Sequence, residues 1–169
     1  MNVILEGPDG SGKSTLAKLL LEHLPLTLKG GEGPPKYEGE MEDRIEKYLS
    51  LDGILFDRHP CISQPIYGSF RPDNKPLSDE LIGRFYNTQP LFIYCYGRAG
   101  DHVADHEGDT PDHLKLIDDN DEAIRKAYHT WACLTVPVTL WYTLEDPDHK
   151  ATISHIVKIC KEYIDAKTK

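Results

Sequence analysis

A glycine-rich segment near the start of the sequence has the composition of a phosphate-binding loop. It reads Gly7-Pro8-Asp9-Gly10-Ser11-Gly12-Lys13-Ser14-Thr15 and fits the pattern GxxxxGK[ST]. Glycines let such a backbone curl so that its N–H groups point at an anion, and the following helix adds the positive end of its dipole. Lys13 can then reach the β- and γ-phosphates, and the Ser14 hydroxyl can bind Mg²⁺. We therefore expect ATP to contact Gly7, Asp9, Gly10, Ser11, Gly12, Lys13, Ser14 and Thr15.

A second group of reactive side chains follows an apolar run at residues 53–56. There Asp57, Arg58 and His59 come at the carboxyl end of a predicted strand, which is where open parallel sheets bind ligands. Asp57 can hold Mg²⁺ through water or orient an attacking oxygen, and Arg58 can bind a phosphate bidentately. Ser14 and Asp57 are thus the predicted metal ligands. Alternatively, Asp57 and Arg58 pair with each other or cap the helix that begins at Pro60.

Strand and helix patterns alternate along the chain and place these groups. Short apolar runs predict strands at residues 2–6, 26–28, 53–56, 91–96 and 136–142. Helical spacing of apolar residues predicts helices at 13–24, 42–51, 60–68, from a cap at Ser78 onward, 119–131 and 150–164. This alternation predicts an α/β fold in which helices cover a five-stranded parallel sheet through right-handed crossovers.

Residues 99–112 are polar and show no hydrophobic period. A segment of this length inside a compact domain is usually a mobile lid or a disordered insert, so we expect a single domain over 1–169 with a lid at about 98–115. His102, His106 and His113 raise the alternative of a metal site. The HxxxH spacing here lacks the apolar helical face and the glutamate base of zinc proteases, which favours the lid.

Length and charge limit the classes of function. The 169 residues suit one domain, and 28 acidic against 19 basic residues argue against a broad nucleic-acid or anionic-membrane surface. No charged leader precedes an apolar stretch, and no run reaches the ~20 apolar residues of a membrane span. We expect a cytoplasmic protein, encoded by a cell or a virus, whose partners are small molecules. A homodimer stays an open alternative to a monomer.

The four cysteines are Cys61, Cys95, Cys133 and Cys160. They lie far apart without metal-binding spacing, and the last three fall in apolar segments. Reduced thiols in a cytosolic protein are the expectation.

Taken together, these motifs resemble the thymidylate kinase branch of the P-loop nucleoside monophosphate kinases over most of the chain. The family has an acid at the place of Asp9 that approaches the acceptor sugar, and an Asp-Arg-aromatic segment similar to residues 57–59. Lys29-Gly30-Gly31 is similar to its basic residue followed by glycines, and residues 124–128 (Ile-Arg-Lys-Ala-Tyr) resemble its Val-Arg-x-x-Tyr helix. The resemblance implies the strand order 2-3-1-4-5. The chain departs from the family in His59 and in a lid without arginine between residues 98 and 125.

The resemblance implies transfer of the ATP γ-phosphoryl group to a deoxynucleoside monophosphate, with thymidylate as the first expectation and Mg²⁺ as cofactor. Lys13 and Mg²⁺ would hold the donor, Arg58 and Lys29 the acceptor phosphate, and Arg98 the transferring group. The expected catalytic residues are Lys13, Asp57, Arg58 and Arg98. The expected acceptor contacts are Asp9, Lys29, Tyr37, Arg58, Ser63 and Tyr67.

Ser63 and Tyr67 lie one helical turn apart after Arg58, so both are expected to face the acceptor base. The alternative is that Tyr67 packs in the core and Ser63 is solvated, in which case the base would lie near Tyr37, Arg71 and Phe85.

Two other classes of function stay open. A deoxynucleoside kinase shares the phosphate loop and the Asp-Arg pair, but it needs a general base because its acceptor is a sugar hydroxyl. A non-catalytic nucleotide-binding module would use the loop only for binding.

Overall fold

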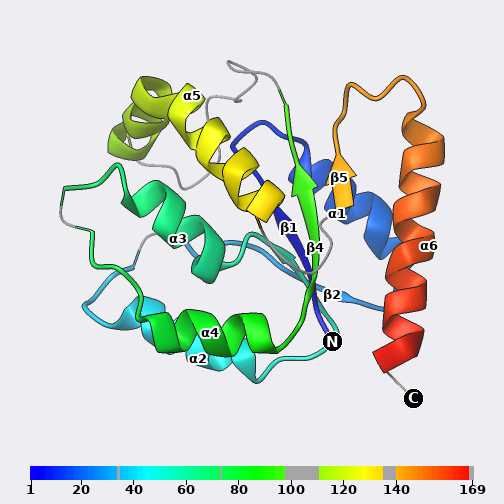
Figure 1. Ribbon diagram of the computed structural model, residues 1–169, viewed down its shortest axis with the longest axis horizontal. Coiled ribbons are helices and arrows are strands. Elements are labelled where there is room, and N and C mark those ends of the chain that lie inside the picture. Colours follow the sequence, from blue (N-terminus) through cyan, green and yellow to red (C-terminus); the bar gives the residue numbers. More distant parts are fainter. Residues whose placement is uncertain (34, 73, 98–110, 135–139, 168–169) are drawn as a thin grey trace.

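The computed structural model describes residues 1–33, 35–72, 74–97, 111–134 and 140–167 (Figure 1). The strands are β1 (Val3–Glu6), β2 (Thr27–Lys29), β3 (Ile54–Asp57), β4 (Leu91–Cys95) and β5 (Leu140–Tyr142). The helices are α1 (Lys13–Leu21), α2 (Glu40–Leu49), α3 (Pro60–Gly68), α4 (Asp79–Asn87), α5 (Pro111–Leu134) and α6 (His149–Lys167).

All five strands are parallel and lie in the order β2-β3-β1-β4-β5, which confirms the expected topology. β1 is the central strand, and its Leu5 pairs with Asp57 of β3. Glu6 at the end of β1 pairs with Tyr94 of β4. The carboxyl ends of β1 and β3 therefore meet at one edge, so the glycine-rich loop and the Asp-Arg segment emerge side by side.

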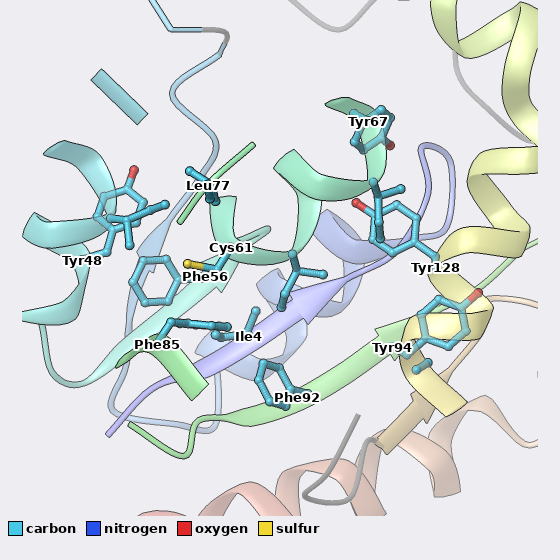
Figure 2. Close-up of a cluster of buried hydrophobic side chains, with 14 of the residues drawn as sticks. Ile4, Tyr48, Phe56, Cys61, Tyr67, Leu77, Phe85, Phe92, Tyr94 and Tyr128 are labelled. Carbon is cyan, nitrogen blue, oxygen red and sulfur yellow. The ribbon is translucent and has the colours of Figure 1, made fainter. Parts of the chain in front are cut away.

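Two hydrophobic layers separate the sheet from its helices, because successive strand residues point to opposite faces. Ile4, Phe56 and Phe92 point to the face covered by α2, α3, α4 and α5, where Figure 2 shows them packed with aromatic side chains of those helices. Leu5 and Ile93 point to the other face, which α1 and α6 cover (Figure 1). The predicted α/β fold is thus confirmed: a layer of helices covers each face of the five-stranded parallel sheet.

Helix α5 begins earlier than the sequence predicts. The expected start was residue 119, but the helix runs from Pro111 through the acidic stretch 118–121. Asp118 and Asp119 are exposed, whereas Ile117 is buried in the same core cluster as Ile124. Asp118 and Asp119 therefore belong to the solvent face of a longer helix. Residues 111–115 of the expected lid are helical, and residues 98–110 lie outside the described residues.

Smaller differences concern where elements end. Helix α1 stops at Leu21, three residues before the expected end, and α2 begins at Glu40, two residues before the expected start. The described part of β5 is Leu140–Tyr142, and residues 135–139 of the expected strand lie outside the described residues.

The cysteines differ in burial. Cys61, Cys95 and Cys160 are buried free thiols; for Cys95 and Cys160 this agrees with their apolar sequence segments. Cys133 is exposed near the end of α5, which corrects its assignment to an apolar segment: it lies on the solvent side of an amphipathic helix. Among the helices that the structure describes, none has the length and apolar composition needed to cross a bilayer.

Candidate active site

The loop between β1 and α1 depends on glycine at two positions. Gly7 has φ 151°, and a Cβ there would lie 1.9 Å from the carbonyl oxygen of Cys95 in the neighbouring strand. Gly12 has φ 82° as the residue preceding α1, and a Cβ there would lie 2.6 Å from Leu144 Cγ. The loop is therefore pressed against β4 and against the segment that follows β5.

This close approach gives a stability prediction. Gly7→Ala is expected to lower the free energy of unfolding by at least about 2 kcal/mol, because backbone must move to admit the methyl group and φ is strained for alanine. Gly30→Ala is the matched control, since a Cβ at Gly30 has open space around it. It should stay within about 0.5 kcal/mol of the wild type in urea unfolding. Equal losses in the two variants would contradict the packing described for Gly7.

Lys13 lies folded over its own loop. Its Nζ donates to the carbonyl of Pro8 at 2.6 Å and to Ser11 Oγ at 3.2 Å. Burial lowers the pKa of Lys13, and the nearby Arg58 charge adds to this, while the carboxylates of Asp9 and Asp57 oppose it. An ammonium held this way gains from an anionic ligand, because phosphate oxygens would restore the charge balance that burial removes.

Ser14 and Asp57 meet across the two loops. The Ser14 hydroxyl, in the first turn of α1, donates to Asp57 Oδ2 at 2.8 Å at the end of β3. A hydroxyl and a carboxylate are oxygen ligands that suit Mg²⁺. Within the described residues, no group of three or more His, Cys, Asp or Glu side chains could hold a metal by itself. The pair therefore fits a Mg²⁺ ion whose remaining ligands come from nucleotide phosphates and water.

Asp9, Arg58 and Tyr67 form a compact polar cluster beside the loop. Arg58 donates to Asp9 Oδ1 at 2.6 Å and to the Tyr67 hydroxyl at 2.9 Å, and that hydroxyl donates to Asp9 Oδ2 at 2.7 Å. Burial alone would raise the pKa of Asp9, but the charges of Arg58 and Lys13 and the Tyr67 hydrogen bond outweigh it and hold that pKa well below its usual range. Asp9 is thus an ionised carboxylate that fixes the guanidinium.

His59, the residue after Arg58, is buried in the core. His59 is the residue preceding α3, where its Nδ1 accepts from the Cys61 amide at 3.3 Å. Its ring stacks on Phe85 with centroids 4.2 Å apart. Burial lowers the pKa of His59 to about 3, so the ring is neutral at physiological pH. The imidazole therefore packs as a neutral aromatic ring in the core.

Ser63 and Tyr67, the two expected contacts of the acceptor base, have different surroundings. Tyr67 is buried and its hydroxyl belongs to the cluster with Asp9 and Arg58. The Ser63 hydroxyl donates to the carbonyl of His59 at 3.2 Å within α3 itself. Only Tyr67 of this pair is thus joined to the phosphate-loop side chains in the described contacts.

Lys29 and Tyr37, two further expected acceptor contacts, lie in the segment that leads from β2 to α2. Lys29 pairs with Glu32 and lies over the Tyr48 ring, 5.4 Å from its centroid. Tyr37 is 59% exposed and donates to Asp43 at 3.2 Å. The side-chain contacts described for Lys29 and Tyr37 are thus with this segment and with α2.

Arg98, the expected lid arginine, lies outside the described residues. Arg125 of α5 instead lies at the loop: it donates to the carbonyl of Asp9 at 3.3 Å and to that of Gly97 at 3.1 Å. Asp121 orients it from the same helix through oxygens 2.9 and 3.0 Å from Nε. The sequence marked Arg125 only through the resemblance of residues 124–128 to the family's Val-Arg-x-x-Tyr helix, and Arg125 is not among the expected site residues. The structure brings it to the phosphate loop.

A cavity that the sequence did not indicate lies beside the loop. It has a volume of about 480 Å³ and is lined by Tyr96, Gly97 and residues of the segment 143–147 after β5. A smaller cavity of about 280 Å³ continues from it to Gly10 and Ser11. The sequence predicts residues 143–147 only as the connection after the fifth strand. Their position at the carboxyl end of a parallel strand is the one feature that could have indicated a binding site. The two cavities share Tyr96, Gly97, Thr143 and Glu145 in their lining, and the smaller one reaches the phosphate loop.

Sequence comparison finds thymidylate kinases. Those of two Leptospira interrogans strains are 33% identical to the chain over 93 residues, covering 47% of it and 45% of each enzyme. The chain thus spans about half the length of the curated relatives it matches. No family model matches the chain.

Structure comparison finds kinases and a nucleotide complex at low sequence identity. The YorR protein of Bacillus subtilis, solved with phosphorylated GDP, superposes with a TM-score of 0.70 at 17% identity, covering 95% of this chain and 96% of YorR. Deoxyadenosine kinase of M. mycoides with bound dATP superposes with a TM-score of 0.60 at 16% identity, covering 95% of this chain and 100% of the kinase. These similarities support a fold of the P-loop nucleotide kinase type, in line with the resemblance seen in the sequence.

Proposed function

We propose that the protein transfers the γ-phosphoryl group of ATP to the 5′-phosphate of a deoxynucleoside monophosphate, with dTMP as the first candidate. The observation that carries the proposal is the Arg58 guanidinium fixed against Asp9 next to the Ser14–Asp57 pair. Arg58, suited to bind phosphate, and Asp57, suited to bind Mg²⁺ together with Ser14, then lie beside the same loop at the end of β3. Phosphoryl transfer needs this arrangement, since catalysis rests on positioning and on charge neutralisation.

The residues divide between donor and acceptor. Lys13 and the backbone of the glycine-rich loop would bind the β- and γ-phosphates, and the cavity beside segment 143–147 would receive the donor base. Arg58 would bind the acceptor phosphate, with Asp9 and Tyr67 fixing its orientation. Mg²⁺, held by Ser14 and Asp57, would neutralise charge that develops between the phosphates. Arg125 is suited to support the transferring group from α5 in addition to Arg98.

Asp9 is poorly suited to be the general base that a hydroxyl acceptor needs. A sugar hydroxyl must lose its proton to a base whose pKa lies near the working pH. Asp9, the carboxylate in contact with Arg58, has a pKa held well below that range and is therefore a weak base. A monophosphate acceptor is already ionised, so it needs a cation to bind it and no general base.

An acceptor screen tests the proposal. Purified protein is incubated with ATP, Mg²⁺ and each of the four deoxynucleoside monophosphates or the matching nucleosides, and ADP and the phosphorylated product are measured. At least one monophosphate should give a rate about tenfold above every nucleoside and above ATP hydrolysis without acceptor, a difference of ~1.4 kcal/mol. A nucleoside preference would assign the protein to the deoxynucleoside kinases. ATP binding without product formation would make it a binding module.

The metal site gives a separate prediction. Asp57→Asn should raise the Mg²⁺ concentration for half-maximal rate by about tenfold or more, because a charged oxygen ligand is lost. The matched control is Asp165→Asn, which removes an exposed carboxylate on α6. The test is a Mg²⁺ titration of the initial rate at saturating nucleotide. An unchanged Mg²⁺ requirement in Asp57→Asn would exclude Asp57 as a metal ligand.

A further inference from the structure

Glu6 is a buried acid to which the sequence assigned no role. It is the last residue of β1 and is 0% exposed. Its Oε1 accepts from the backbone N–H of His59 at 2.5 Å. Its Oε2 is also buried and makes no hydrogen bond to any described residue. A carboxylate costs much free energy to bury, so its retention beside the phosphate loop calls for a role.

The His59 amide is the group through which Glu6 acts on the backbone of Arg58. Arg58 has φ 69°, a left-handed conformation that costs a non-glycine residue about 1–2 kcal/mol. The Arg58 N–H donates to the carbonyl of Leu5 at 3.0 Å, and the next N–H donates to the Glu6 side chain. Two consecutive residues of β1 therefore hold the amides on both sides of the Arg58 Cα. This bends the chain out of β3 at the point where the guanidinium must turn toward Asp9.

The second oxygen of Glu6 faces groups of the same cluster. Arg58 Nε is buried as well and has no hydrogen-bond partner among the described residues, and the buried Tyr128 hydroxyl lies close enough to Glu6 to act on its carboxyl group. Tyr128 lies beside Tyr67, with ring centroids 6.0 Å apart (Figure 2). Burial raises the pKa of Glu6 to about 7, and the His59 amide, the charges of Arg58 and Lys13 and the Tyr128 hydroxyl oppose this shift. Glu6 is thus tied to Arg58 by charge as well as through the backbone.

We propose that Glu6 is a positioning residue for Arg58: it fixes the left-handed turn at Arg58 through the His59 amide and so aims the guanidinium at the acceptor phosphate. This inference rests on the proposed function for its kinetic consequence. The contact between the Glu6 side chain of β1 and the turn after β3 does not depend on the proposed function.

Kinetics of three variants test the role. Glu6→Ala should raise the KM for the best monophosphate of the acceptor screen by about tenfold, while the KM for ATP changes less than about twofold. Glu6→Gln should recover most of this loss, since its amide oxygen still accepts from the His59 N–H. Val3→Ala, a buried change in the same strand, is the control for lost stability. If it raised the acceptor KM as much as Glu6→Ala at an equal melting temperature, the positioning role would be excluded.

A double variant tests whether Glu6 acts through Arg58. In the Arg58→Ala background, adding Glu6→Ala should alter the acceptor KM by less than about twofold, because the group that Glu6 orients is already gone. A full independent effect would overturn the proposal.

Amide hydrogen exchange separates this inference from the proposed function. The His59 amide should exchange at least about tenfold faster in Glu6→Ala than in the wild type, and Glu6→Gln should retain protection. This readout needs no activity. If the wild type showed no kinase activity but the exchange result held, the proposed function would fail and the structural role of Glu6 would stand. Unchanged exchange in Glu6→Ala would overturn the role itself.

Discussion

Lys13→Met is expected to lower kcat/KM by about a thousandfold, ~4 kcal/mol, because the ammonium that contacts the transferring phosphates is removed. The same variant should unfold at a temperature no lower than the wild type at pH 7. Burial lowers the pKa of Lys13, which means that the charged form is less favourable in the folded protein than in the unfolded chain. Methionine fills a similar volume without that penalty.

The lowered pKa of Lys13 also predicts how the stability difference between Lys13→Met and the wild type changes with pH. Between the lowered pKa of Lys13 and the ordinary lysine value, the unfolded chain binds more protons than the folded protein. Wild-type stability should therefore gain from Lys13 as pH rises through that alkaline window, and the advantage of Lys13→Met should shrink. Urea unfolding at pH 7 and in the alkaline window measures both effects.

Lys18→Met is the matched control for this prediction, because Lys18 lies on the exposed side of the same helix. It should keep activity within about twofold of the wild type. If Lys13→Met stayed as active as Lys18→Met, the glycine-rich loop would have no catalytic role and the proposed function would be wrong.

Arg58 gives the second large effect. Arg58→Ala should lower kcat/KM for the acceptor by about a hundredfold, ~2.7 kcal/mol, with little change in the KM for ATP, since a bidentate phosphate contact is lost. Steady-state kinetics with each substrate varied in turn separates the two. An equal rise in both KM values would place Arg58 outside the acceptor site.

A pair of substitutions at Arg58 measures the strain of the turn. Arg58→Gly and Arg58→Ala both remove the partner of Asp9, so they lose the same ion pair. The two variants differ in backbone strain, because φ at this position is 69° and glycine adopts this conformation without the strain that alanine has. Arg58→Gly should therefore be more stable than Arg58→Ala by about 1 kcal/mol, or about 2–4 °C in melting temperature. Equal melting temperatures would show that the left-handed turn relaxes once the side chain is gone.

The amino-acid sequence alone determined the parts of this protein that depend on local pattern. The spacing of Gly7, Gly12, Lys13 and Ser14 indicated a phosphate loop, and the apolar run before Asp57 indicated a strand that ends in charged residues. Alternating strands and helices predicted the parallel sheet, and the family resemblance implied its order, which the structure confirms. These features are short in sequence and carry their own geometry, so a single chain suffices to read them.

Contacts between distant segments decided the rest. Helical spacing could not choose the face on which Ser63 or Tyr67 lies, and only packing of α3 on the sheet joined Tyr67 to Asp9, 58 residues away. The sequence predicts a helix that begins at residue 119, but Ile117 is buried in the same cluster as Ile124 and α5 begins at Pro111.

Glu6 shows the same limit most clearly. In the sequence it is one polar residue at the end of a strand, and nothing nearby marks it as buried. Its partner, the His59 amide, lies 53 residues away and meets it only because β1 and β3 are neighbours in the sheet. The cavity beside segment 143–147 likewise forms only where β5 brings that loop next to Gly10 and Ser11. Local sequence specifies which groups are present, but burial and partnership arise from the tertiary fold, because they depend on pairs of segments that the chain itself does not place side by side.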